Sequence, residues 1–191
     1  MISPETFHVV STELVVGAFS VSGLSFLFCL LLHLDVLKKE DWKPLFDNVA
    51  HFTLAFGLAA TPFAVLSGLS SAPGDGLNSP ILVNKMFLSM TGMGFAIGVF
   101  ISRWRLSQRV WATSKTATVQ CITGLAACGS MLLTASAGGT FLRGESLIDV
   151  LSLPYETVLL FPTAISGIGL AIGIGLLVLG WLRMNVASSV H

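Results

Sequence analysis

Five long apolar runs constrain the fold of this chain more than any other feature of its sequence. They cover roughly residues 14–34, 45–70, 81–102, 116–137 and 157–182. A helix of about 20 residues crosses a hydrocarbon core of about 30 Å, so each run is long enough to span a bilayer. The runs therefore predict an all-α fold, with residues 1–191 forming one polytopic membrane domain, a bundle of five transmembrane helices.

The composition argues against a soluble domain. Charged residues make up 10% of the chain and hydrophobic residues 53%, whereas about 25% of the residues in a soluble domain are charged. Five spans also leave no room for a separate soluble domain within 191 residues. We therefore expect the lipid bilayer as a partner, and we expect no nucleic acid.

Basic residues gather in alternate gaps between the runs, and this pattern predicts the topology. Gaps 35–44 and 103–115 hold seven of the ten Lys and Arg residues, namely Lys38, Lys39, Lys43, Arg103, Arg105, Arg109 and Lys115. Cytoplasmic loops are enriched in Lys and Arg, which places the N-terminus outside and the C-terminus inside. Residues 1–13 contain no Lys or Arg and no A-x-A site follows the first run, so this run is interpreted as a retained helix rather than a signal peptide. The expected location is the cell membrane, as a multi-pass protein.

The tryptophans support the same orientation. Trp42, Trp104, Trp111 and Trp181 all fall at helix ends that are predicted to be cytoplasmic. Amphipathic indole rings favour the headgroup region of a bilayer. We therefore predict that these four side chains anchor the protein at the cytoplasmic interface.

Small residues form close-packing faces on the third and fifth runs. They are Gly94, Gly98, Gly167, Gly169, Ala171, Gly173 and Gly175. Gly94 to Gly98 and Gly169 to Gly173 are G-x-x-x-G spacings, which let helix backbones approach closely. These faces predict packing within the bundle or against a partner subunit, and the fifth helix is the best candidate for the partner contact.

The order of several motifs resembles a known family. The first helix starts near an external His, and the second helix is rich in small residues and reads HFTLAFGLAATPFAVLSGL. The third helix ends in Arg-Trp-Arg, and the fourth helix closes on GGTFLRGESLIDVL. The chain is similar over about residues 10–150 to a family of small four-helix prokaryotic membrane proteins of unknown function. That family carries a Gly-Gly, hydrophobic, Arg-Gly signature after its last helix. The resemblance makes the fifth helix an addition.

The chain departs from this family pattern at the starts of two helices. Asn84 and Lys85 stand where members often have a His, and the first helix lacks the usual His-Pro start. A metal or haem role of those histidines therefore does not carry over. The family has no settled activity, but its members often occur beside redox proteins, so the resemblance implies a respiratory membrane.

His33 and His51 are the strongest candidates for chemistry. Both are expected about one to two turns from the cytoplasmic ends of the first two helices, which should be antiparallel neighbours. Two imidazoles at one level are a ligand set for a b-type haem. Against this, haem ligands need a wider separation than closely packed neighbouring helices provide, and interfacial histidines need no special role. Haem b is therefore an alternative, and the primary expectation is no cofactor.

Charged residues at the external helix ends form a second candidate group, consisting of Glu13, Lys85, Arg143 and Glu156. An ion pair of Lys85 with Glu13 or Glu156 would lower the cost of charge near hydrocarbon. Transporters place polar groups near the midplane, at broken helices. This chain offers only Gln120, Ser, Thr and Gly there and shows no inverted repeat, so a small transporter or channel is a second alternative.

No nucleophile–base pair or metal-ligand cluster appears in the sequence, so an enzyme and a metal site are not expected. Cys29, Cys121 and Cys128 all lie in apolar runs without a C-x-x-C spacing, which predicts buried packing residues. The sequence favours a non-catalytic accessory subunit of a larger membrane complex, respiratory or redox-linked, with other membrane subunits as partners.

Overall fold

The computed structural model describes residues 3–71 and 78–146, together with residues 152, 168, 171–175 and 178. It divides the chain into two compact units, residues 1–158 and 159–191. The first unit contains four long helices, α1 (Pro4–His33), α2 (Lys43–Ser71), α3 (Pro80–Leu106) and α4 (Ser114–Arg143). Two short 3-10 turns, η1 (Glu40–Trp42) and η2 (Ser107–Trp111), precede α2 and α4.

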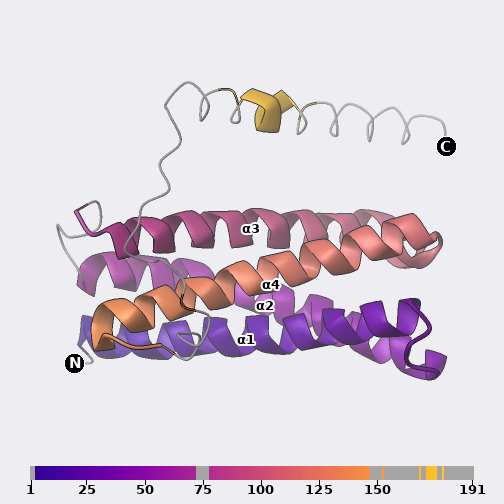
Figure 1. Cartoon of the computed structure of the whole chain (residues 1–191), viewed down its shortest axis with the longest axis horizontal. Coiled ribbons are helices and arrows are strands. Elements are labelled where there is room, and N and C mark those ends of the chain that lie inside the picture. The colour runs from indigo at the N-terminus through magenta and orange to yellow at the C-terminus, as the bar shows by residue number, and fades with distance from the viewer. Residues whose placement is uncertain are drawn as a thin grey trace. The chain divides into compact units, whose positions relative to one another are not determined.

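The four helices run up, down, up and down, side by side along one axis (Figure 1). Helix α1 packs closely against α2 and α4, and α4 packs against α3. Helices α2 and α3 make far fewer contacts with each other, so one side of the bundle is open. This arrangement confirms the predicted helical bundle for this unit, and by length and composition all four helices could cross a membrane, which supports a membrane protein.

Helix α1 begins about ten residues before its apolar run because its start is well capped. The Ser3 hydroxyl accepts a hydrogen bond from the backbone N–H of Thr6, and Pro4 occupies the first turn. A Ser cap followed by Pro is typical of a helix start, since both relieve unpaired backbone N–H groups. At the other end of the bundle the chain reverses through Asp35, whose φ is 58°.

The ends of α3 and α4 follow similar rules. The hydroxyls of Ser79 and Thr113 accept hydrogen bonds from the N–H groups of Leu82 and Thr116, and so cap the two helix starts. Helix α4 ends at Gly144, which is left-handed with φ 75°. Glycine adopts this conformation without a steric cost, and it is the common helix terminator.

Close helix contacts in the core depend on glycines that face bulky side chains. A Cβ at Gly124 would lie 2.6 Å from the ring of Phe26, and one at Gly57 would lie 2.8 Å from the ring of Phe19. Both phenylalanine side chains are completely buried. The buried Ser22 hydroxyl on α1 donates to the carbonyl of Ala50 on α2 at 2.8 Å. Glycine and serine therefore seat α1 against α2 and α4, as small residues do in membrane bundles.

In the second unit, residues 168, 171–175 and 178 are helical. The rest of the fifth apolar run, including Gly167, Gly169 and Trp181, lies outside the described residues. A fifth membrane helix and the orientation of the termini therefore stay predictions.

Candidate functional site

A charged pair inside the bundle links α2 to α3 near the end where α1 leads into α2. The side chain of Asp47 is 1% exposed. Arg103 donates to its two carboxylate oxygens, from Nε to Oδ1 at 3.2 Å and from Nη2 to Oδ2 at 2.8 Å. Such two-point contacts are the strongest geometry for an Arg–carboxylate pair. The pair neutralises a carboxylate that the bundle otherwise excludes from water.

His51 continues this polar network on the next turn of α2. Its Nδ1 lies 2.8 Å from the backbone oxygen of Asp47 and 3.0 Å from Asp47 Oδ1. Its Nε2 lies 2.9 Å from Nε2 of Gln120 on α4. Both ring nitrogens of His51 are thus engaged.

The amide of Gln120 fixes the roles of these atoms. Gln120 Nε2 donates to the backbone carbonyl of Val99 on α3 at 2.9 Å, and a carbonyl can only accept. The same NH₂ group therefore donates to Nε2 of His51, so the proton of a neutral His51 ring is on Nδ1 and points to Asp47. We call Asp47, His51, Arg103 and Gln120 the polar network. It joins three helices in one connected set of hydrogen bonds.

A cavity of about 280 Å³ lies beside the polar network. Its lining includes Glu40, Lys43, Asp47, Gln108 and Trp111. Within the part of the chain that the structure describes, the buried indole N–H of Trp111 has no hydrogen-bond partner, and its ring faces the Lys43 ammonium at 5.3 Å. The cavity leaves the carboxylate of Asp47 next to polar side chains at the bundle end rather than in apolar packing.

His33 does not join this network. Its Nε2 lies 3.1 Å from the hydroxyl of Ser114, at the start of α4. His51 instead packs edge-on against the Phe26 ring, with the ring centroids 5.1 Å apart. The two histidines that the sequence paired for haem therefore have separate partners, and His51 has both nitrogens in hydrogen bonds within the protein. This geometry favours a structural role for His51.

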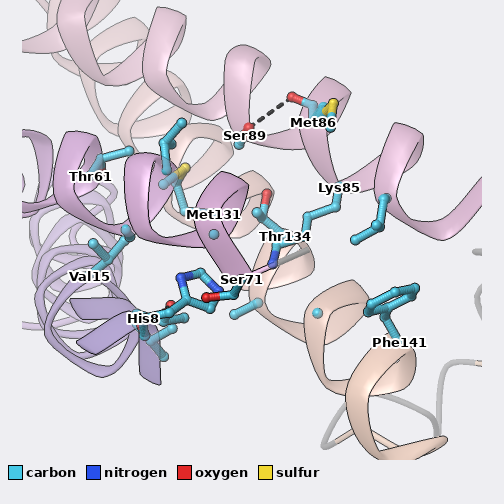
Figure 2. Close-up of a pocket in the computed structure, with 18 of the residues that line it drawn as sticks. His8, Val15, Thr61, Ser71, Lys85, Met86, Ser89, Met131, Thr134 and Phe141 are labelled. Carbon is cyan, nitrogen blue, oxygen red and sulfur yellow. Dashed lines mark hydrogen bonds between the residues drawn. The ribbon is translucent and has the colours of Figure 1, made fainter. Parts of the chain in front are cut away.

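A second cavity, of about 220 Å³, lies at the opposite end of the bundle. All four helices line it, and Figure 2 shows His8 from α1 and Lys85 from α3 directed into it. Lys85 extends toward α4, where a Cβ at Gly138 would lie 3.0 Å from its Nζ. We call this space the lateral cavity.

The external charged group that the sequence suggested is only partly assembled. Lys85 lines the lateral cavity, while Glu13 and Arg143 are exposed. The structure records no ion pair of Lys85 with Glu13 or with any other residue of 3–71 and 78–146. Glu156 lies outside the described residues, so its pairing stays a prediction.

The predicted glycine faces point outward in the described part of the chain. Gly94 and Gly98 are exposed, and a Cβ at either would meet nothing within 4 Å. In the second unit, Ala171 and Gly173 are exposed, and Gly173 and Gly175 likewise have nothing within 4 Å of a Cβ. The Gly94–Gly98 face is therefore not used for packing among the four described helices.

The described tryptophans gather at one end of the bundle. Trp42 lies in η1, Trp104 near the end of α3 and Trp111 in η2, and the first two are exposed. These elements flank the two connections at the end that carries the polar network (Figure 1). This placement matches the arrangement expected for interface anchors on one side of a membrane.

Sequence reasoning missed Asp47, Arg103 and His8 as site residues. Asp47 could have been found from its i, i+4 spacing to His51, which puts both side chains on one helix face. Arg103 is assigned by the sequence to the gap after the third run, but it lies inside α3, and Asp47 lies inside α2. The three cysteines are buried, as predicted. Residues 3–71 and 78–146 contain no group of three His, Cys, Asp or Glu side chains that could hold a metal.

The chain matches no protein-family model, no curated protein and no solved structure. The resemblance to the four-helix prokaryotic family therefore stays a prediction.

Proposed function

We propose that this protein is a non-catalytic accessory subunit of a larger complex in the cell membrane. It crosses the bilayer several times, with its N-terminus outside and its C-terminus inside, and it binds a neighbouring subunit through α3. The resemblance described above favours a respiratory or redox-linked complex. The observation that carries the proposal is the outward Gly94–Gly98 face of α3.

This face has the form of a helix-docking groove. Gly94 and Gly98 are one turn apart, and the exposed side chains of Phe95, Ile97 and Ile101 flank them. A glycine groove offers lipid chains little dispersion contact, whereas a second helix can approach its backbone closely. The same chain uses glycine for that purpose at Gly124 and Gly57, where bulky rings fill the space. The outward pair therefore fits a helix from outside the four-helix unit.

Helix α3 is also the helix least covered by its neighbours. In its most apolar 18-residue window, 17% of the residues are buried, against 44% in α4. In a bilayer, exposed Leu or Phe needs no partner, because lipid is as apolar as they are. Exposed glycine on the least covered of the four helices is thus a more specific indication of a partner-binding face than exposed apolar area.

The polar network supports the same reading. It lies near one end of the bundle and satisfies its own donors and acceptors between helices. Transport sites are typically near the midplane, at interrupted helices, and α2, α3 and α4 are each continuous across their lengths. The network therefore fits a role in fixing helix positions, which an accessory subunit needs.

Purification of the tagged full chain from its native membranes in mild detergent tests this proposal. The wild type is expected to retain at least one other membrane subunit in stoichiometric amount. The double variant Gly94→Leu/Gly98→Leu should lose it, while Gly17→Leu, another exposed glycine with open space around it, should not. A wild-type monomer, or equal retention by both variants, would contradict the accessory role.

A further inference from the structure

We propose that the lateral cavity binds an anionic phospholipid from the surrounding bilayer. The lipid phosphate lies against Lys85, and the first part of an acyl chain follows the apolar wall. This site is independent of the partner-binding face on α3.

Among the described residues, the cavity contains a cation without a counter-charge. Lys85 lines it, and none of its lining residues is Asp or Glu. Within residues 3–71 and 78–146 the structure records no ion pair or hydrogen bond of the Lys85 ammonium. Charge inside a membrane-facing cavity is costly unless it is paired. An anionic headgroup supplies the missing charge.

The depth of the cavity fits a lipid phosphate. Lys85 is five residues from the start of α3, and His8 is four residues from the start of α1. At 1.5 Å per residue the two lie about 8 Å and about 6 Å inside the helix ends. Both start at the same end of the bundle, so the cation lies just below the expected membrane surface, where headgroups and glycerol meet the acyl chains.

The wall of the cavity suits an acyl chain. It is mainly apolar, with Val15, Val65, Leu69, Leu82, Met86 and Leu142 among its members. Its volume of about 220 Å³ is below the about 300–1,000 Å³ of pockets that enclose whole small molecules. Because the exposed side chains of Val65, Leu69 and Leu142 form part of its wall, the cavity reaches the bundle surface, and the rest of a lipid can remain in the bilayer.

Two glycines allow the polar side chains to enter the cavity. Gly138 provides space for the end of Lys85, and a Cβ at Gly68 would lie 2.9 Å from Cε1 of His8. His8 is held by Ser67, whose hydroxyl donates to the Phe63 carbonyl at 2.6 Å and lies 3.1 Å from His8 Nδ1. Because that hydroxyl proton is already used, His8 Nδ1–H is the donor, and Nε2 of the neutral ring is an acceptor that can take a hydrogen bond from a headgroup hydroxyl. His8 is the second polar contact of the site.

Native mass spectrometry of the full-length protein, released from nanodiscs of mixed phosphatidylglycerol and phosphatidylcholine, tests the proposal. We expect one phosphatidylglycerol to be retained in preference to phosphatidylcholine. Lys85→Gln should lower this retention about fivefold or more, since one Lys near a membrane surface contributes about that factor toward an anionic lipid. Lys85→Arg should keep it. Lys115→Gln, which removes an exposed lysine at the other end of the bundle, should have no effect.

A second variant tests the space in the lateral cavity separately from the charge of Lys85. Ala135→Leu places extra carbons in the cavity and leaves Lys85 intact, so it should also reduce lipid retention. Equal retention of both lipids by the wild type would overturn the proposal, as would undiminished retention in Lys85→Gln. Displacement of the lipid by millimolar inorganic phosphate would also overturn it, because a soluble anion would then be the ligand.

Discussion

Arg103 on α3 holds both carboxylate oxygens of Asp47 on α2, and this pair bridges the side of the bundle where the two helices otherwise make few contacts. At the opposite end of the bundle, all four helices line the lateral cavity. The ion pair therefore holds α3 against α2 at this end of the bundle.

Loss of one partner of this pair should be strongly destabilising. Removal of one member of a buried ion pair costs about 3–5 kcal/mol, because the other charge is left uncompensated. We expect Arg103→Ala to lower the free energy of unfolding by about 3 kcal/mol, since its side chain is 18% exposed. Reversible unfolding in detergent measures this value. Arg105→Ala, two residues along and exposed, is the control, and a similar effect of the two variants would contradict the assignment.

Gln120 should contribute through its two hydrogen bonds. Gln120→Leu leaves Nε2 of His51 and the Val99 carbonyl without this donor, and an unsatisfied buried polar group costs about 1–3 kcal/mol. The exposed Gln108→Leu should change the free energy of unfolding by less than about 0.5 kcal/mol. Chemical denaturation of both variants in the same detergent compares them. No difference between the two would show that the network does not stabilise the bundle.

A structural role of His51 and the haem alternative predict different results for the variant His51→Ala. Because both ring nitrogens of His51 are bonded to Asp47 and Gln120, we expect His51→Ala to lower thermal stability without changing the visible absorption spectrum. Expression with added haem precursor, followed by absorption spectroscopy of the purified protein, measures this. A Soret band that disappears in His51→Ala or His33→Ala would establish the electron-transfer alternative instead.

The contact between α1 and α4 should be sensitive to a single methyl group. Gly124→Ala places a Cβ against the buried Phe26 ring, and such overpacking typically costs about 1–3 kcal/mol. Gly129→Ala on the same helix meets open space and should stabilise by up to about 1 kcal/mol, as alanine favours a helix over glycine. Thermal unfolding of the pair gives the comparison. Equal melting temperatures would count against this packing.

The sequence was sufficient for the helices but not for the polar network. Continuous apolar runs predict long membrane helices because every backbone group must be paired in lipid. The apolar run begins about ten residues after the start of α1, since Pro4–Glu13 mixes polar residues with Phe7, Val9 and Val10, and the cap at Ser3 marks the helix start. Asp47 and Arg103 are 56 residues apart in sequence, and neither helix pattern alone shows that their faces meet. The lateral cavity likewise depends on the spacing between α2 and α3, which hydrophobicity does not encode.

Cysteine labelling tests the proposed orientation. Ser71 ends α2 and Ser107 follows α3, so the two lie at opposite ends of the bundle. In intact cells, a membrane-impermeant thiol reagent should label Ser71→Cys and not Ser107→Cys. Background should be low, because the three native cysteines are buried. Labelling of Ser107→Cys alone would reverse the orientation, and labelling of both from one side would contradict the topology.

Site-specific photo-crosslinking at Gly98 tests the accessory role most directly. A photoreactive residue at Gly98, on the outward glycine face of α3, is activated in native membranes, with the same residue at Gly17 as the matched control. We predict a crosslink from position 98, and not from position 17, to a second membrane polypeptide of constant mass. Crosslinks from position 98 only to lipid, or only to residues 157–182 of the same chain, would contradict the proposal that α3 binds a partner subunit.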